Sequence, residues 1–263
     1  PIRLFTTMAS SPTKGKHSVL DLQGFGHLLL SGAVVTIKLA LTSLVLGLVF
    51  GLLGATAKMS RLKLFNALAT AYTTIIRGIP ELLSVMFIYF GGTLLLGAVL
   101  PWFGYDEYVD VSPFWAGVAA LSIAFGAYAT ETFRMAFQEI PKGQKEAGQA
   151  IGLNNFQILW RIILPQVWRT VLPGLGNLFL VLLKDTALVS VVGLEDIMRH
   201  AKTAATSTQS PFTFYMAAAL IYLSLTVIIT GAIMLLEWWN NPAERYAKRL
   251  SKIGYRDKLG VAK

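Results

Sequence analysis

Long apolar runs separated by short polar connections dominate the sequence, and this pattern predicts an all-α integral membrane protein. Five runs are expected to form transmembrane helices in the lipid bilayer: residues 27–57, 65–100, 114–137, 172–194 and 214–236. Each run reaches the ~20 residues that a helix needs to cross the hydrocarbon core. The sequence thus predicts an N-terminal tail at 1–26, a transmembrane domain at 27–240 and a basic C-terminal tail at 241–263.

The second run is too long for one straight helix and contains an internal break. The interruption is Arg77-Gly78-Ile79-Pro80-Glu81. Pro80 donates no backbone hydrogen bond, and the residue before a proline avoids the α-helical region. We therefore expect a kinked or broken helix that makes a single crossing.

The composition supports a membrane protein and excludes several other classes. Hydrophobic residues make up 54% of the chain and charged residues 14%, with a mean hydropathy of +0.58; a soluble domain carries about a quarter charged residues. The net charge of +9 does not predict nucleic-acid binding, because the basic residues lie in connections and tail rather than on one folded face. Since the sequence has no cysteine, it offers no disulfide and no thiolate for catalysis or metal binding.

The distribution of basic residues predicts the orientation. Lysine and arginine are concentrated in the connections at 58–64 and 138–170 and in the C-terminal tail. The connection between the second and third spans has Asp106, Glu107 and Asp110 and no basic residue. The positive-inside rule then places the C-terminus in the cytoplasm and the N-terminus in the periplasm. Five crossings give the same parity.

The connection at 138–165 predicts a helix, a sharp turn and a second helix. A proline opens a helix without losing a hydrogen bond that the helix needs, so Pro141 predicts a short helix at 142–150. Residues 151–155 predict a turn, because they contain a glycine and paired asparagines that permit left-handed backbone. A second helical run follows at 156–165. On the cytoplasmic side, this is the shape of a docking element.

The residues of this connection resemble the EAA loop of the membrane subunits of ABC importers. That family pattern is Glu-Ala-Ala, three residues, Gly, nine residues, Ile, one residue and Leu-Pro. The matching residues are Glu146, Ala147, Gly148, Gly152, Ile162, Leu164 and Pro165. The spacing is intact, and the one departure is Gly148 in place of the third alanine. The alternative interpretation is an incidental amphipathic loop in the cytoplasm.

In such proteins the loop is a coupling helix that seats in a cleft of an ATPase. The resemblance therefore implies an ATPase-coupling role for Glu146, Ala147, Gly148, Gly152, Leu164 and Pro165. Gly152 would provide the turn. Glu146 would either cap the helix or pair with a basic residue of the ATPase.

Three further stretches, 74–81, 128–134 and 184–191, look like the amino acid permeases of ABC importers, so the resemblance covers about residues 24–240. It is strongest to the permease subunits of histidine/lysine/arginine/ornithine importers and their arginine and opine relatives. The resemblance implies a MetI-like, type I importer fold of five or six helices in the bacterial inner membrane. It also implies a heterodimer with a homologous permease subunit, two cytoplasmic ATP-binding subunits and a periplasmic amino-acid-binding protein.

The sequence has no motif for hydrolysis of its own. It contains no Walker A pattern, no His-Glu-x-x-His and no Gly-x-Ser-x-Gly, and His17, His27 and His200 are scattered. We therefore predict no catalytic residue, no metal site and no cofactor in this chain. ATP and Mg are expected on the partner ATPase.

Ionisable residues within the spans are candidates for the substrate path, because a charge in the membrane is costly and a functional role is the default expectation. The candidates are Arg77, Glu81, Glu131, Lys184 and Asp185, and Lys38 also lies near the middle of the first span. The carboxylates would bind the ammonium or side chain of a cationic amino acid. Arg77 or Lys184 would bind its carboxylate.

Each candidate also has a structural interpretation. Glu131 and Arg134 lie three residues apart, a spacing typical of a structural ion pair. Arg77 either satisfies carbonyls freed by the break or acts in gating. Lys184 and Asp185 are adjacent, so on a helix they point about 100° apart and need partners elsewhere.

These observations predict a permease subunit that carries amino acids, most of all the basic ones: histidine, arginine, lysine and ornithine. An opine or another polar amino acid is the alternative substrate. A secondary transporter would usually show more spans and an internal repeat, neither of which the sequence has. A membrane anchor for an enzyme complex would not require charges in the middle of its spans.

Overall fold

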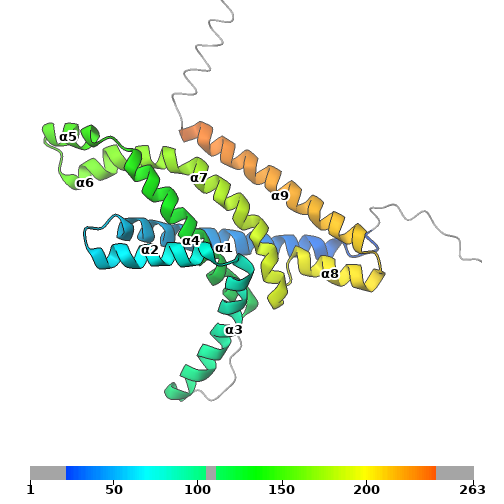
Figure 1. The fold of residues 1–263 in the computed structure, drawn as a ribbon. Coiled ribbons are helices and arrows are strands. Elements are labelled where there is room, and N and C mark those ends of the chain that lie inside the picture. The colour runs from blue at the N-terminus through cyan, green and yellow to red at the C-terminus, as the bar shows by residue number, and fades with distance from the viewer. Residues whose placement is uncertain (1–21, 105–110, 241–263) are drawn as a thin grey trace, which may run out of the picture.

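The structure, a computed structural model, describes residues 22–104 and 111–240, and its regular elements over these residues are all helical. In chain order they are α1 (Gly26–Lys58), α2 (Lys63–Gly78), α3 (Glu81–Val99), η1 (Leu100–Phe103), α4 (Pro113–Glu139), α5 (Lys142–Ala150), α6 (Asn155–Ile158), η2 (Leu159–Ile163), α7 (Leu164–Asp185), η3 (Thr186–Val192), α8 (Ile197–Thr208) and α9 (Pro211–Asn240). Figure 1 shows their arrangement. The predicted acidic connection residues Asp106, Glu107 and Asp110, most of the N-terminal tail and the C-terminal tail lie outside the described residues.

Five helical segments of the described chain are long and apolar enough to cross a membrane, as predicted. They are Gly26–Lys58, Glu81–Phe103, Pro113–Glu139, Asn155–Val192 and Pro211–Asn240. The fourth differs most from its prediction, which began it at residue 172. Its helical backbone already begins at Asn155 and passes Pro165 and Pro173 without a stop. The all-helical fold class is confirmed.

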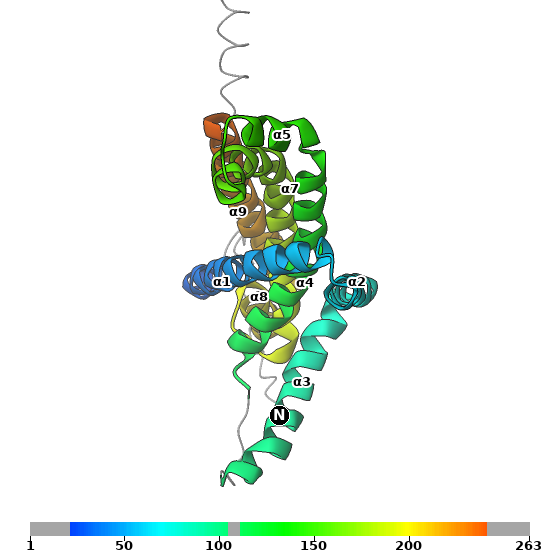
Figure 2. The same cartoon turned by 90° about the vertical axis from the view of Figure 1, so that its left-hand side faces the viewer.

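The break in the second run is confirmed, and it separates two helices. Helix α2 ends at Gly78, Ile79 is extended (φ −100°, ψ 133°), and α3 starts after Pro80. The two helices then run in clearly different directions (Figures 1 and 2). Only the segment from Glu81 is long and apolar enough to be a span, so the prediction of a single crossing holds.

Helices α1 and α4 form the centre of the molecule because small residues let their backbones approach closely. A Cβ atom at Gly47 would lie 2.6 Å from Cδ1 of Phe125. A Cβ atom at Gly51 would lie 2.6 Å from the Cβ of Ala129. Small residues at helix contacts are typical of membrane bundles, where packing rather than the hydrophobic effect drives association. The buried core is therefore continuous along α1, α4 and α7.

A second apolar cluster joins the start of α1 to α8 and α9. Phe214 and Ile197 are fully buried within it. Asp196 precedes α8 as its N-cap and accepts a hydrogen bond from the backbone N–H of Arg199 at 2.8 Å. Burial raises the pKa of the Asp196 carboxyl to about 6, against the lowering effect of hydrogen bonds from the Arg199 and Met198 backbone. This carboxyl thus lies in a packed environment away from α5.

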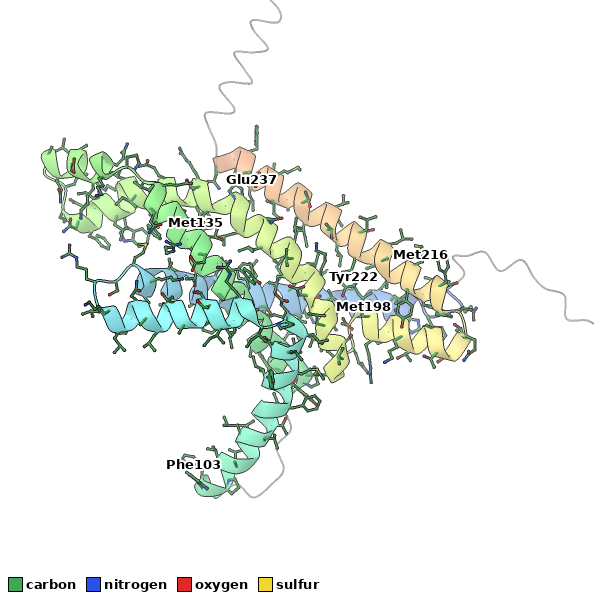
Figure 3. All side chains as sticks on the ribbon, viewed as in Figure 1. Phe103, Met135, Met198, Met216, Tyr222 and Glu237 are labelled. Atoms are coloured by element: carbon green, nitrogen blue, oxygen red, sulfur yellow. The ribbon has the colours of Figure 1, made fainter. Side chains whose placement is uncertain are left out.

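Two parts of the fold extend from this packed body. Helix α3 and the short η1 project away from it, with the exposed Phe103 near the tip (Figure 3). Helix α5 lies at the opposite end of the molecule from this tip (Figures 1 and 2). These extensions expose surface that other parts of the described chain do not cover.

Candidate functional site

Helix α5 has the bounds that the sequence predicts, Lys142–Ala150. Pro141 stands at its N-cap in extended backbone, and no side chain caps the helix. Glu146 lies in the middle of α5 and is exposed, so the hypothesis that it caps the helix is wrong. Every residue of α5 is exposed except Gly148. The rest of the described chain therefore leaves nearly all of the surface of this helix uncovered.

Gly148 is the point at which α5 rests on the helix that follows it. A Cβ atom there would lie 2.9 Å from Cγ1 of Ile158 and 3.0 Å from Cδ1 of Ile162. The family pattern has alanine at this position. The departure to glycine thus lets α5 lie closer to α6 and η2, since an alanine would require both isoleucines to shift.

The turn after α5 depends on Gly152, as predicted. Gly152 has a φ of +81°, which a glycine adopts without steric cost. Its N–H donates to the carbonyl of Gln149 at 2.9 Å, and the N–H of Leu153 donates to the carbonyl of Gly148 at 3.0 Å. This pair of bonds is a Schellman motif, which satisfies carbonyls at the end of a helix.

Asn154 does not use the left-handed backbone that the sequence permitted. It is extended (φ −76°, ψ 165°) and caps α6. Its side chain accepts from the Gln157 backbone N–H at 2.9 Å, and the Gln157 side chain accepts from the Asn154 N–H at 3.0 Å. This capping box fixes the direction in which the chain enters the fourth span.

The end of the EAA-like pattern is built into that span rather than into α5. Segment η2 is a π-helix, and Leu164 and Pro165 follow it at the start of α7. Pro165 has no N–H to donate, so one carbonyl in the preceding turn loses its backbone partner. The side-chain amide of Gln166 donates to the carbonyl of Ile162 at 2.7 Å. The helix continues through this proline, which stands in the first turn of α7, whereas the predicted helical run stopped there.

Glu131 is fully engaged by partners within the chain. Its carboxylate accepts from Arg134 Nε at 2.8 Å, which confirms the predicted pair, and it also forms an ion pair with Lys58. Lys58 Nζ donates to Thr73 Oγ1 at 2.8 Å. The network connects the end of α1 to α2 and α4. Sequence reasoning missed Lys58, because it lies 73 residues from Glu131 and no local spacing connects them.

Arg77 and Glu81, on either side of the break, both meet Tyr128 of α4. The Arg77 guanidinium carbon lies 5.2 Å from the centre of the Tyr128 ring, a cation–π geometry. The Tyr128 hydroxyl donates to Glu81 Oε1 at 3.3 Å. Sequence reasoning gave Tyr128 no role. The spacing could have indicated a role for Tyr128, because Tyr128 precedes Glu131 by three residues and so lies on the same helix face.

Glu81 and Asp185 line one narrow cleft between α3, α4 and α7, together with Tyr128. Both carboxylates are partly buried, and neither forms an ion pair with another residue in the described ranges. Lys184 is exposed and lines no part of this cleft. The structure thus brings together two of the three predicted carboxylates and separates Lys184 from them.

A larger polar cavity of about 540 Å³ lies on the other side of Tyr128. It is lined by Lys58, Thr73, Thr74, Arg77, Gly78, Tyr128, Glu131 and Arg134. Three of these residues are cationic and one is anionic, so this cavity is basic while the neighbouring cleft is acidic. Tyr128 lines both spaces. Among the described residues, no group of three metal-ligating side chains could hold a metal ion.

Comparisons with known proteins agree on one family. A family model described as "Binding-protein-dependent transport system inner membrane component" matches residues 43–237. The histidine/lysine/arginine/ornithine transport system permease protein HisQ of Salmonella typhimurium is 44% identical over 216 residues, which cover 82% of this chain and 94% of that protein. The nopaline transport system permease protein NocQ of Agrobacterium fabrum is 43% identical and covers 84% of this chain and 94% of its own.

Solved structures show the same likeness. An amino acid ABC transporter crystallised with histidines contains a chain that is 34% identical, with a TM-score of 0.71, and the match covers 84% of this chain and 97% of that one. A chain of the MetNI methionine ABC transporter in an inward-facing conformation matches with a TM-score of 0.65, 82% of this chain and 97% of its own. At 17% identity, the second match shows a shared fold alone.

Proposed function

The chain belongs to the family of binding-protein-dependent transport system inner membrane components, and on this premise we propose that it carries basic amino acids across the bacterial inner membrane. The resemblance to ABC importer permeases that the EAA-like spacing indicated is confirmed, and so is the MetI-like helical fold. The protein is a multi-pass membrane permease subunit of the amino acid ABC importer class. Its relatives are named for histidine, lysine, arginine, ornithine and nopaline transport.

We propose that α5 is the coupling helix and seats in the ATPase. Its exposure along almost its whole length supports this role, because an isolated nine-residue helix is marginal in water and gains from a partner. Exposed apolar side chains follow it at Ile151 and Phe156, which are 75% and 68% exposed. Glu146 is free to pair with a basic residue of the ATPase. Movement of α5 would reach the spans through Gly148 and η2.

The substrate proposal rests on one observation: Glu81 and Asp185 share a cleft, and neither forms an ion pair within the described residues. A partly buried carboxylate that forms no ion pair is costly, and a cationic substrate would offset that cost. Arg77 lies across Tyr128, on the basic side. A basic amino acid would therefore place its cationic groups toward the cleft and its carboxylate toward Arg77. Glu131, which already has two cationic partners, becomes a structural residue.

The family name and the relatives support association with an ATPase and a substrate-binding protein. We propose two cytoplasmic ATPases that hold ATP and Mg, a periplasmic amino-acid-binding protein, and a second, homologous permease subunit. The long apolar surfaces of α3 and α9, which the described chain leaves uncovered, fit a partner subunit or lipid. We place the N-terminus in the periplasm and the C-terminus in the cytoplasm, from the basic residues that flank the spans.

Uptake by the reconstituted importer tests this function. The permease, its homologous partner and the ATPase are reconstituted in vesicles with ATP inside and the binding protein outside. We expect uptake of labelled arginine, histidine or lysine that stops on ATP depletion and survives an uncoupler. Uptake that an uncoupler abolishes while ATP is present would identify a secondary transporter instead.

An opine or another polar amino acid is the second candidate substrate. The similarity to a relative named for nopaline transport supports this candidate. Competition decides between them. If excess unlabelled nopaline blocks uptake and excess arginine does not, the substrate is an opine.

A further inference from the structure

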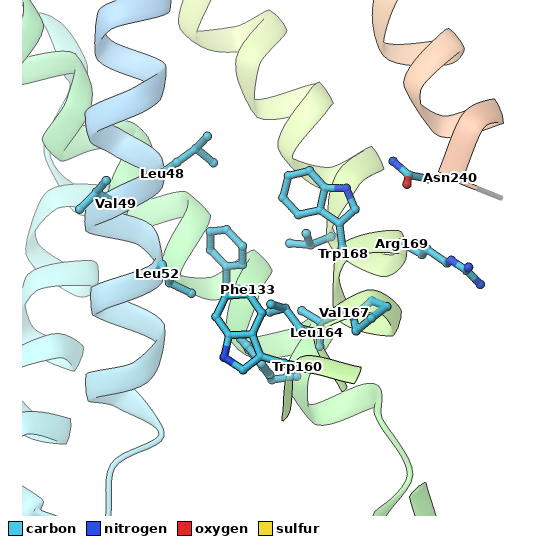
Figure 4. Close-up of a pocket in the computed structure, with 13 residues that line it drawn as sticks. Leu48, Val49, Leu52, Phe133, Trp160, Leu164, Val167, Trp168, Arg169 and Asn240 are labelled. Atoms are coloured by element: carbon cyan, nitrogen blue, oxygen red, sulfur yellow. The ribbon is translucent and has the colours of Figure 1, made fainter. Parts of the chain in front are cut away.

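An apolar groove opens where α1, α4, α7 and the end of α9 meet (Figure 4). Its volume is about 570 Å³, within the range of ~300–1,000 Å³ that is usual for ligand pockets. It is separate from the acidic cleft and from the basic cavity, with which it shares no lining residue. The proposed substrate path therefore does not account for it.

The walls of the groove are formed by apolar side chains one helical turn apart on three helices. They are Leu48 and Leu52 of α1, Phe133 and Phe137 of α4, and Leu164 and Trp168 of α7. Residues four apart lie on the same face of a helix, so each wall continues over at least one turn. The apolar lining of the groove, called the trough below, is therefore continuous over at least one helical turn on each of the three helices.

One end of the groove is polar. Arg169 is the only charged residue among the described residues that line it, and it is exposed and forms no ion pair within the described ranges. Asn240, at the end of α9, and the partly exposed indole of Trp168 lie on the same side of the groove as Arg169, whereas Trp160 lies beside Phe133 and Leu164 (Figure 4). Tryptophan and arginine are typical of the depth at which lipid headgroups meet the acyl chains.

The groove lies toward the cytoplasmic side. Leu52 precedes the last residue of α1, Lys58, by six positions, which is about 9 Å along a helix. Lys58 is followed by further basic residues, and the positive-inside rule places such a cluster on the cytoplasmic side. The Leu52 wall of the groove therefore lies about two helical turns from the inner leaflet's headgroups.

We infer that this groove binds an anionic phospholipid of the inner leaflet, with one acyl chain in the trough and the headgroup phosphate at Arg169. Water does not fill an apolar groove that faces hydrocarbon, and an empty groove loses dispersion contacts along its walls. An acyl chain matches the lining. The charge of Arg169 selects a negative headgroup, since basic residues near the cytoplasmic surface attract anionic lipids.

The lipid would also touch the segment that carries α5. Leu164 and Pro165 line the groove directly after η2. Trp160, within η2, lies against Phe156 with ring centres 6.0 Å apart. One wall of the lipid site is therefore part of the helix on which α5 rests.

Lipid retention by the purified importer complex tests the inference. The complex is incubated with equal amounts of phosphatidylglycerol and phosphatidylcholine that have the same acyl chains, and bound lipid is measured by native mass spectrometry. We expect the wild type to retain phosphatidylglycerol about fivefold over phosphatidylcholine, as one basic residue near the surface provides. Arg169→Gln should remove this preference, and Leu52→Trp should reduce retention of both lipids by filling the trough.

Matched variants control for fold and for general charge. Arg161→Gln removes an exposed arginine that does not line the groove, and Val227→Trp adds bulk at an exposed position of α9 outside it. Both should retain lipid as the wild type does. Val49→Trp, at a second exposed position of the groove wall, repeats the filling test if Leu52→Trp does not fold.

Three results would overturn the inference. Equal effects of Arg161→Gln and Arg169→Gln would show only nonspecific lipid around the protein. A rise in retained lipid after removal of residues 241–263 would show that the chain's own C-terminal segment fills the groove. Loss of the ATPase subunits from both filling variants, with lipid retention unchanged, would make the groove a protein contact.

Discussion

The carboxylates on opposite sides of Tyr128 differ in how they are paired. Glu131 is only 14% exposed and has Lys58 and Arg134 as partners. Glu81 and Asp185 are also partly buried, yet neither forms an ion pair within the described residues. Removal of a carboxylate that has internal cationic partners leaves those cations unpaired, whereas a carboxylate without an ion pair is available to a cation from outside. The difference separates a structural carboxylate from candidates for substrate binding.

The partners on each side also explain the position of Tyr128. The Tyr128 ring forms a cation–π contact with Arg77 on the basic side, and the Tyr128 hydroxyl donates a hydrogen bond to Glu81 on the acidic side. It therefore stands at the boundary between a cavity with three cations and a cleft with two carboxylates. A ligand with both charges would be oriented by this boundary.

The largest expected effect is the loss of stability when Glu131 is neutralised. In Glu131→Gln, Lys58 and Arg134 lose their shared carboxylate, and removal of one member of a buried ion pair costs about 3–5 kcal/mol. We expect a lower thermal midpoint for the detergent-solubilised complex. The double variant Lys58→Met/Glu131→Gln should recover part of the loss, since it leaves one cation fewer without a partner. A Glu131→Gln protein with wild-type stability and no uptake would place Glu131 in the substrate path instead.

The opposite result is expected for Asp185. In Asp185→Asn the cleft loses a charged partner for the substrate, which is worth about 1.5–3 kcal/mol, so uptake of arginine should fall roughly 10- to 100-fold. Stability should stay equal or rise, because the variant removes an unpaired charge from a partly buried position. Uptake is measured in vesicles at matched amounts of folded protein. Wild-type uptake by Asp185→Asn and by Glu81→Gln would remove the cleft from the substrate path.

Local features of this comparison could be predicted from the sequence, and its long-range features could not. The break at Pro80, the helix of α5, the turn at Gly152 and the Glu131–Arg134 pair all follow from residues within a few positions of one another. The partnership of Glu131 with Lys58 depends on how α1 packs against α4. No spacing rule reaches across that distance.

The fourth span shows a second limit. The sequence predicted a helical run that reached residue 165 and a separate span that began at residue 172, but one helical segment continues through Pro165. A proline in the first turn of a helix lacks an N–H that this turn does not need, so a proline by itself does not fix where a helix ends. Asn154 shows that residue type alone does not fix the backbone conformation. The sequence permitted left-handed backbone there, but the backbone is extended and the side chain caps α6.

Glu146 differs from the carboxylates beside Tyr128, because it is exposed and lies on α5. Glu146→Lys should leave the stability of the permease unchanged and weaken its association with the ATPase about tenfold, or about 1.4 kcal/mol. Association is measured by titrating the ATPase onto permease in nanodiscs. Gln149→Lys introduces the same charge on the same exposed helix and should have a smaller effect. If both substitutions weaken association equally, added charge rather than the loss of Glu146 is responsible.

Asp196 provides the smallest and most specific test, because it is a buried carboxyl outside the cleft. Its pKa in the folded chain is about 6, above the ~3.9 of an unfolded aspartate, so between these values the folded state holds a proton that the unfolded state has released. Its contribution to stability must therefore decrease as pH rises from 5 to 7, by about 1 kcal/mol.

Asp196→Asn should remove this contribution, because asparagine can also accept the cap bond from Arg199 and does not ionise. The thermal midpoints of the variant and the wild type are measured at pH 5 and pH 7. The difference between the two proteins is compared at each pH, so that the effects of the other carboxyl groups cancel. Uptake at pH 7 should be unchanged, in contrast to Asp185→Asn. If Asp196→Asn lowers uptake as strongly as Asp185→Asn does, then unpaired burial alone does not identify the substrate path, and the distinction between the two regions beside Tyr128 loses its functional meaning.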